Sequence, residues 1–492
     1  MSIDIQSIIQ HNKSLKETIL EKDTELQSIQ RQFWDELKLQ NLINKPIIAT
    51  GHQPILYYPG ILFKNYYAGL LAVKTGGSAL NFIVDSDNGK IEIPVPFSNN
   101  NKMYKDQVVI KSDRDTVFSG FHPSPEEVNQ FFTRIGNDLR TLDNNHQKIQ
   151  KAFQNYQMAF SQIFEKTKHF IDTENTLRTE FESSLGINFY DLKISDVSNT
   201  KAYNRFILYI IKYIKTFRFH FNEAINQNKN KDYQPVKELS QTEDWYELPL
   251  WWIINDRRYP VFMRTTDKTL YFSSPEINEK INISISGNTE EQIANKLNTV
   301  ITLYPKATTL TFMTRILFSD LFIHGSGAVE YEKVNNRFFN TFFGLNSSLQ
   351  FISATGNIYL PLENNMPDLS EIEENYRRLQ KWLKEYKRNP EDLLSPELAD
   401  KYKEKKRSIG SQMRDVTPEK RKELHNRMEQ LNEKMKEHLN ESRIKTENLL
   451  AQYEQVLKNK SVYFERQYPY FLYPKETLSE ENFESNLKTQ VH

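Results

Sequence analysis

The sequence predicts an α/β protein that has a parallel sheet in its core and a long helical arm near its C-terminus. A strand, a turn, a helix and a second strand follow one another within residues 47–84. This is the order of a βαβ unit, and such units assemble parallel sheets. Beyond Pro367 the composition changes sharply to Glu, Lys, Arg, Asn and Gln, which is typical of solvated helices. At 492 residues the chain is long enough for more than one domain.

The residues before the βαβ unit are predicted to form one amphipathic helix. Apolar residues between Ile8 and Leu42 recur at spacings of three and four, and Pro46 ends this pattern. The segment is polar and carries charges of both signs, so it lacks the apolar run of a secretory signal. We therefore expect a cytoplasmic protein.

In the βαβ unit, residues 47–50 form the first expected strand and residues 79–84 the second. The helix between them begins after Pro59-Gly60 and ends before Gly76-Gly77, because proline is favoured in the first turn and glycine after the last. Further helices are expected at residues 121–185, 201–228, 310–320 and 329–343, and further strands at residues 248–254, 261–264, 269–272 and 281–285.

The C-terminal segment is predicted to form a coiled-coil arm. Helical patterns cover residues 368–388, 396–410 and 418–460. The last of them keeps a seven-residue apolar repeat at Leu424, Met428, Leu431 and Met435. Such an arm either pairs two chains into a homodimer or folds back as a hairpin within one chain. The expected domains are an N-terminal helix (1–45), an α/β core with helical insertions (46–365), the arm (366–460) and an aromatic tail that docks on the core (461–492).

The composition excludes several classes of function. Lys plus Arg and Asp plus Glu number 64 each, so no net charge draws the protein to nucleic acid or to an acidic membrane. The chain has no cysteine, which rules out disulfides, thiolate zinc sites and a cysteine nucleophile. The most apolar windows, residues 206–214 and 248–254, are too short to cross a bilayer. We expect a small-molecule substrate, and neither nucleic acid nor a membrane as partner.

The first candidate site is the turn at residues 51–54, directly after the first strand. In open parallel sheets, ligands bind at the carboxyl ends of strands, and a helix that begins there directs free backbone amides at an anion. His52 adds a donor whose charge changes near neutral pH. Alternatively, Gly51 and Pro54 only shape a turn in which His52 binds local carbonyls. Candidate ligand-binding residues in this segment are Gly51, Gln53, Gly60 and Lys64.

A second candidate is Asp85 with Asp87, which follow the second strand and hence lie at the same edge of the sheet as His52. Two carboxylates two residues apart can orient an amine, act as acid and base, or hold Mg²⁺ through water. Residues 87–89, Asp-Asn-Gly, are also a common turn composition. We assign His52, Asp85 and Asp87 as candidate catalytic residues, and we assign no protein ligands to a metal.

The third candidate lies at residues 324–327, between an apolar run and a helix. Its glycines leave the amides of a helix start open to an anion, although Ser326 can equally be a simple N-cap. One cleft explains three such turns better than three unrelated loops do. Candidate ligand-binding residues here are His324, Gly325, Gly327 and Glu330. Glu247 and Arg264 are secondary candidates, because a charged residue at a strand end is usually just solvated.

Together these motifs resemble the cysteine-adding enzyme family of bacillithiol biosynthesis. The resemblance rests on Thr-Gly-His-Gln and Tyr-Pro-Gly within residues 47–74, on the acidic strand end at 85–87, on Phe-Ile-His-Gly-Ser-Gly-Ala-Val-Glu-Tyr at 322–331, on the late heptads and on the Tyr-Pro-rich tail. It covers most of the chain in the same order. It implies a Rossmann-like core related to class I synthetases and nucleotidyltransferases, with a coiled coil that pairs two subunits.

By this resemblance the protein is a ligase that joins cysteine to glucosaminyl malate, or a relative that joins another amine and acid. His52 and the amides of the following helix are expected to stabilise phosphate charge, and Asp85 and Asp87 to orient the amine or a metal. His324 and Glu330 are expected to line the opposite wall. The cofactor stays open, with ATP or another adenine nucleotide and Mg²⁺ as candidates. The alternative is a non-catalytic coiled-coil scaffold with a vestigial nucleotide-binding cleft.

Overall fold

The computed structural model describes residues 4–100, 102–110, 116–228, 236–363, 369–413 and 416–492. The contacts within the chain define two compact units. Residues 1–99, 105–358 and 466–492 form the first, and residues 100–104 and 359–465 form the second. The first unit is a mixture of sheets and helices, and the second is mainly helical.

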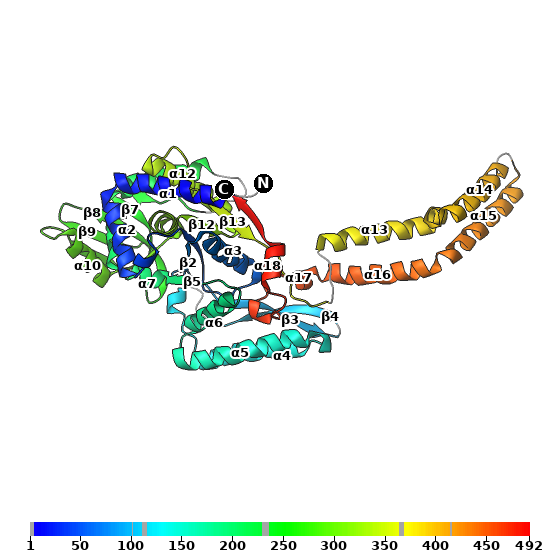
Figure 1. Ribbon diagram of the computed structural model, residues 1–492, viewed down its shortest axis with the longest axis horizontal. Coiled ribbons are helices and arrows are strands. Elements are labelled where there is room, and N and C mark those ends of the chain that lie inside the picture. Colours follow the sequence, from blue (N-terminus) through cyan, green and yellow to red (C-terminus); the bar gives the residue numbers. More distant parts are fainter. Residues whose placement is uncertain (1–3, 101, 111–115, 229–235, 364–368, 414–415) are drawn as a thin grey trace. The chain divides into compact units, whose positions relative to one another are not determined.

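The first unit is built on a six-stranded sheet in the order β14-β13-β12-β1-β2-β5 (Figure 1). Five of these strands are parallel and β14, at one edge, is antiparallel. The strands are β1 (Ile47–His52), β2 (Ser78–Ile83), β5 (Phe189–Lys193), β12 (Leu321–His324), β13 (Phe351–Thr355) and β14 (Lys488–Val491). The predicted α/β class is therefore confirmed, with a sheet that is parallel except at one edge.

The predicted βαβ unit is formed by β1, α3 (Pro59–Thr75) and β2. Pro59 stands in the first turn of α3, and Gly76 ends the helix in the left-handed conformation (φ 64°), which glycine adopts without a Cβ clash. Strand β1 pairs with β2 along its whole length, but its pairing with β12 covers only Ile48 and Ala49. Beyond Ala49, β1 and β12 are no longer joined by backbone pairing.

The prediction of a single N-terminal helix from the apolar spacing is wrong. The segment forms two helices, α1 (Ile5–Lys22) and α2 (Thr24–Glu36), followed by the short η1 (Gln40–Leu42). Asp23 separates them: its backbone leaves the helical conformation, and its carboxylate accepts a hydrogen bond of 2.9 Å from the Leu26 N–H. An aspartate that caps a new helix in this way interrupts the old one.

A second, antiparallel sheet has the order β10-β9-β8-β7-β11, with β6 paired to β7. Its strands are β6 (Gln241–Thr242), β7 (Trp245–Ile254), β8 (Arg257–Thr265), β9 (Thr269–Ser273), β10 (Lys280–Ser284) and β11 (Thr302–Pro305), and the pair β3 (Glu92–Asn99) and β4 (Lys102–Val109) forms a third sheet. The four strands predicted in this region are confirmed by β7 to β10.

The helical regions of the first unit are more divided than the sequence predicted. Besides α1, α2 and α3, they include α4 (Pro125–Arg140), α5 (Gln147–Thr167), α6 (Phe170–Ser184), α7 (Ile194–Ser198), α8 (Lys201–Lys212), α9 (Ile214–Gln227), α10 (Glu290–Val300), α11 (Ala307–Phe312), the π-helix η4 (Met313–Phe318), α12 (Val329–Phe343) and α18 (Glu480–Asn486). Among the helices that the structure describes, none is long and apolar enough to span a membrane.

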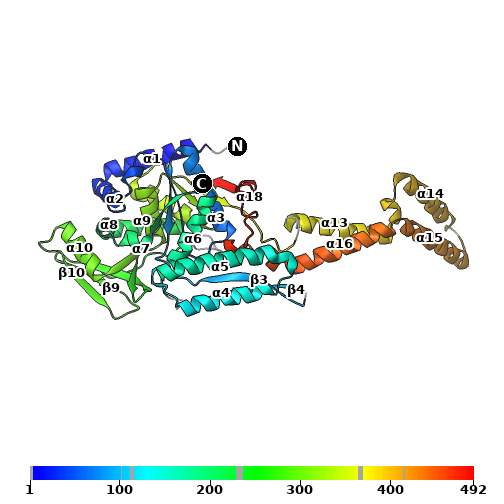
Figure 2. The ribbon, with the colours of Figure 1, turned by 60° about the horizontal axis from the view of Figure 1, so that its bottom comes forward.

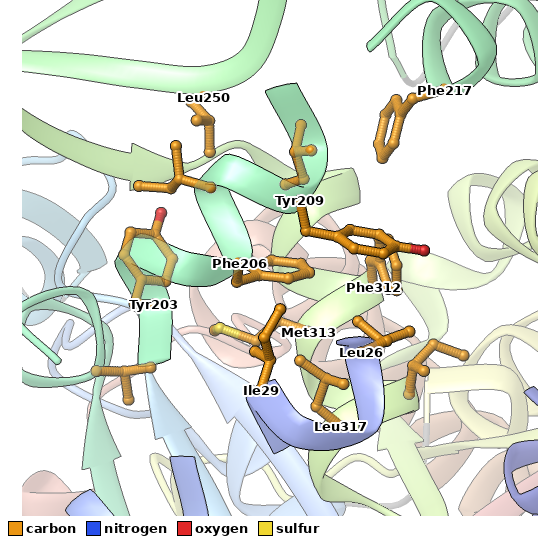
Figure 3. Packing of buried hydrophobic residues seen from close by; sticks show 14 of the residues in the cluster. Leu26, Ile29, Tyr203, Phe206, Tyr209, Phe217, Leu250, Phe312, Met313 and Leu317 are labelled. Carbon is orange, nitrogen blue, oxygen red and sulfur yellow. The ribbon is translucent and has the colours of Figure 1, made fainter. Parts of the chain in front are cut away.

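A large apolar cluster joins α2, α8 and the segment α11–η4 (Figure 3). The rings of Phe206 and Phe312 lie 5.2 Å apart at 82°, and Ile29 of α2 is fully buried in the same cluster. Burial of such a side chain contributes about 1.5–3 kcal/mol. This cluster fixes α11, from whose first residues the candidate site described below takes part of its wall.

The second unit consists of helices that pair within the chain (Figure 2). Helix α13 (Leu369–Arg388) packs along α16 (Asn440–Lys458), and α14 (Pro396–Gln412) packs along α15 (Pro418–His438). The predicted helix 418–460 is therefore interrupted at Leu439, the C-cap of α15 and N-cap of α16. Within the chain these helices fold back on one another as a hairpin. The predicted helix start at residue 368 and the domain boundary at 365 lie outside the described residues.

The tail from residue 466 onward belongs to the first unit. The Tyr470 N–H donates to the Tyr57 carbonyl (2.8 Å), and the Phe471 ring stacks on Tyr156 at 4.1 Å. The last residues form β14, which pairs with β13 and was not predicted. Burial of these aromatic rings is what makes the tail part of the core.

Candidate active site

A cavity of about 750 Å³ lies at the carboxyl ends of β1 and β12. From β1 the chain builds outward through β2 and β5, then returns to add β12 and β13 on the other side of β1. A point where the strand order reverses in this way is the usual ligand position in open α/β sheets. The antiparallel sheet supplies the facing wall through β7 and β8. Six predicted site residues line the cavity: Gly51, His52, Gln53, Asp87, Glu247 and His324.

His52 enters the cavity as a neutral imidazole. Its Nδ1 lies 3.1 Å from the Gln53 carbonyl, and since a carbonyl only accepts, Nδ1 carries the proton and Nε2 keeps its lone pair. Burial, together with the nearby Lys64 ammonium, lowers the pKa of His52 to about 3. This geometry does not support the predicted role as a charged donor to phosphate. With so low a pKa the ring is neutral and only weakly basic.

The two predicted aspartates have different surroundings. Asp87 lines the cavity, where it accepts a hydrogen bond of 2.8 Å from Gln53 Nε2 and forms an ion pair with Arg258. Asp85 does not line it: its carboxylate accepts from the backbone N–H (2.9 Å) and the hydroxyl of Ser195, in the first turn of α7. The prediction that both aspartates act in the site is corrected accordingly, and Asp85 is an anchor for α7.

Asp85 provides a pH test of this anchoring role. Burial raises its pKa to about 6, so the folded protein binds its proton more tightly than the unfolded chain does, and stability falls as pH rises from about 4 to 6. We expect Asp85→Asn, which can bond both Ser195 groups without charge, to lose this dependence, a difference on the order of 2 kcal/mol. Urea denaturation at pH 4 and pH 7 measures it. Parallel pH profiles for the two proteins would contradict the assignment.

Three cations in the cavity wall were not predicted: Lys237, Arg258 and Lys306. The Arg258 guanidinium lies 4.8 Å and the Lys306 ammonium 4.6 Å from the Trp251 ring centre. Lys306 donates to Glu247 at 2.5 Å, and burial lowers its pKa. The sequence carries one usable signal, Asn-Asp at residues 255–256, which favours a tight hairpin. In the structure both residues have positive φ, and the hairpin pairs Arg258 with Ile253 on the strand that carries Trp251.

His324 forms the wall on the β12 side. It is 9% exposed, and its Nε2 lies 3.4 Å from Oε1 of Glu332. The other oxygen of this carboxylate, Oε2, forms an ion pair with Arg315 at 2.6 Å. Burial lowers the pKa of His324 to about 4, so this ring is also neutral. The predicted Glu330 is exposed and bonds Lys333 instead, because residues two apart on a helix lie on different faces.

The remaining predicted residues lie outside the cavity lining. Arg264 sits over the Trp245 and Tyr271 rings and pairs with Asp244, and Lys64 is buried behind the turn at residues 51–54. The predicted glycines outside the lining are Gly60, in the first turn of α3, and Gly325 and Gly327, before α12.

Within the described residues, no group of three or more His, Asp or Glu side chains is arranged to hold a metal ion. No family model matches the chain, and no curated protein matches its sequence. The function is therefore argued from the cavity: a neutral imidazole acceptor, two cations held on one indole ring, and carboxylates that pair with those cations.

Proposed function

We propose that this protein is a carbon–nitrogen bond-forming ligase with a Rossmann-like core that acts on a small anionic substrate. One observation carries the proposal: His52, whose ring is neutral, and the cations Arg258 and Lys306 line the same cavity. The strand order supports the fold assignment. Counted along the chain, the strands of the main sheet stand in the order 3-2-1-4-5-6, as in doubly wound dinucleotide-binding sheets.

The chemistry of such a condensation matches these groups. The nitrogen lone pair of an amine attacks a carboxyl carbon, the C–N bond forms, a C–O bond breaks with its electrons leaving on oxygen, and the nitrogen loses a proton. His52 lines the cavity and is the proposed acceptor of that proton: its ring is unprotonated at neutral pH, and its pKa of about 3 makes it a weak base. An adenine nucleotide with Mg²⁺, when bound, would supply the activation of the carboxyl group.

Arg258 and Lys306 are proposed to hold an anionic group of the substrate. Each already pairs with a carboxylate, Asp87 and Glu247 respectively, so each cation is compensated in the free protein. A substrate carboxylate can share or take over these hydrogen bonds, and charge-assisted bonds of this kind are the strong ones in proteins. Cysteine and glucosaminyl malate, or another amine and acid, are the proposed substrates.

Strand β8 offers a matched pair of arginines for testing this. Arg258 and Arg264 each stack on a tryptophan and pair with an aspartate, but only Arg258 lines the cavity. We expect Arg258→Met to weaken binding of glucosaminyl malate about 10-fold, the loss of one charge-assisted hydrogen bond, and Arg264→Met to leave it unchanged. Isothermal titration calorimetry measures both. Equal affinities for the two variants would remove Arg258 from the binding site.

The reaction itself is tested by mass spectrometry. The protein is incubated with cysteine and glucosaminyl malate, with and without ATP and Mg²⁺. A product whose mass equals the sum of the two substrates minus water supports the ligase, and the dependence on ATP shows whether a nucleotide is consumed. If neither this pair nor other amines and acids yield a product, the proposal fails.

The helical arm carries a second proposal, pairing of two chains into a homodimer through a coiled coil. Helix α16 favours this, because Ile444 is 45% exposed and lines a shallow hollow together with Leu449. Light scattering on the full chain and on a deletion of residues 368–460 distinguishes the roles. Lost self-association with retained substrate binding supports a dimeric enzyme. Retained self-association with loss of a protein partner supports the scaffold alternative.

A further inference from the structure

Lys64 is a buried cation with no access to the cavity. It belongs to α3 and is 3% exposed. Its ammonium donates to the Gly51 carbonyl at 2.8 Å, to the Thr50 hydroxyl at 3.1 Å and to Asn65 Oδ1 at 3.4 Å. All three ammonium donors are therefore used, and two of the three acceptors belong to the end of β1.

These two acceptors lie where β1 and β12 are no longer paired. Backbone pairing of the two strands ends at Ala49. Beyond it, the Thr50 hydroxyl donates to the Ile323 carbonyl of β12 at 3.0 Å, while the same oxygen accepts from Lys64. Lys64 therefore connects α3 to the hydrogen bond between Thr50 and Ile323 that joins the two strands. His52 follows two residues after Thr50 on β1, and His324 follows Ile323 on β12.

If this position served packing alone, an apolar side chain would stabilise the fold more than a lysine does. The inward face of α3 is otherwise largely apolar, and a buried cation is destabilising unless hydrogen bonds and opposite charge compensate it. The charged and titratable groups that face Lys64 are Glu182 and Arg178 of α6, His52 of β1 and His324 of β12. Burial is the largest influence and lowers the pKa of Lys64 to about 7.

We propose that Lys64 is a positioning residue: its ammonium holds the Gly51 carbonyl and the Thr50 hydroxyl so that the backbone fixes the His52 ring relative to His324 across the gap between β1 and β12. The part of this inference that concerns catalysis rests on the proposed ligase function. The part that concerns the state of His52 does not, because it applies to the free protein.

Lys16 provides the matched control. It is also buried, and its ammonium donates to a backbone carbonyl, that of Ser319 (2.7 Å), and to Asp320 (2.6 Å). Asp320 in turn accepts from the Ile47 N–H at 2.8 Å. Lys16 thus stabilises the amino ends of the same two strands whose carboxyl ends Lys64 holds.

The experiment compares Lys64→Met with Lys16→Met by NMR of protein labelled with ¹⁵N-histidine, with His52 assigned through His52→Gln. In Lys64→Met we expect the ¹⁵N shifts of the His52 ring to change and its pKa to rise, since a nearby positive charge is lost. Lys16→Met should keep the wild-type His52 signals although both variants lose stability. We also expect kcat of Lys64→Met to fall about 100-fold with little change in KM, the effect of a displaced catalytic group.

A folded Lys64→Met protein with wild-type His52 signals and wild-type kcat would overturn the proposal. If that variant does not fold, Thr50→Val takes its place in the test. It removes the hydroxyl that bonds both Lys64 and the Ile323 carbonyl but keeps the β-branched shape. Unchanged His52 signals in folded Thr50→Val overturn the proposal, and changed signals support it. If the wild-type protein makes no product, the ligase function fails, while the NMR comparison still tests the role of Lys64.

Discussion

In the proposed ligase reaction, replacing His52 with Gln is expected to lower kcat by about 10²–10⁴-fold, because a glutamine of similar size cannot take up the proton that the attacking amine must lose. The neutral ring, with Nδ1 bonded to the Gln53 carbonyl, leaves Nε2 as the acceptor. Initial rates of product formation at saturating substrate measure the effect. His122→Gln is the control, since His122 is exposed and outside the cavity lining, and its rate should equal that of the wild type.

The pH dependence gives the same prediction a second readout. A histidine with its ordinary pKa of about 6.5 would be protonated, and inactive as a base, over much of the range below pH 6. His52, whose pKa is lowered to about 3, stays unprotonated down to pH 5. We therefore expect the pH profile of kcat for the wild type to show no fall near pH 6.5 that is absent from the profile of His52→Gln. Such a fall would show that His52 is not neutral in the free protein.

Replacing Arg178 with Met destabilises the fold by about 3–5 kcal/mol, the usual cost of leaving buried carboxylates without their cation. Arg178 is 1% exposed and forms ion pairs with Glu182 on its own helix and with Asp191 on β5. Its guanidinium also lies 5.7 Å from the Tyr57 ring centre. Urea denaturation measures the free energy of unfolding of the variant and the wild type.

The sign of the pH effect follows from Glu182, whose pKa is already raised by burial. Without Arg178 this pKa rises further, so the variant should lose more stability at pH 8 than at pH 5. Arg134→Met is the control, because its ion pair with Asp106 is partly exposed and is expected to contribute about 0–1 kcal/mol. Similar losses in the two variants would show that the Arg178 network does not stabilise the core.

The parts of the site that follow from local sequence could be predicted. Gly51 and His52 follow a short apolar run, and Asp87 follows the next one, so the rule that parallel strands share a carboxyl edge brings these residues together. His324 follows a third apolar run, and the structure places it at the same edge. The end of α3 at Gly76 could be predicted from another local signal, because a helix commonly ends at a glycine in the left-handed conformation.

The rest depends on contacts between distant segments. Asp85 turns away from the cavity because it binds Ser195, 110 positions later, which no local pattern indicates. Arg258 and Lys306 reach the cavity only because an antiparallel sheet packs over the carboxyl edge of the main sheet. Glu330 is exposed, whereas Glu332, for which no role was predicted, is buried, because only the face of α12 that carries Glu332 turns inward.

A crystal structure of the protein with glucosaminyl malate tests the central claim most directly. We expect the ligand to occupy the cavity at the carboxyl ends of β1 and β12, with its amine within hydrogen-bond distance of the His52 ring and a carboxylate on Arg258 or Lys306. A ligand bound elsewhere, or bound in the cavity with its amine away from His52, would contradict it.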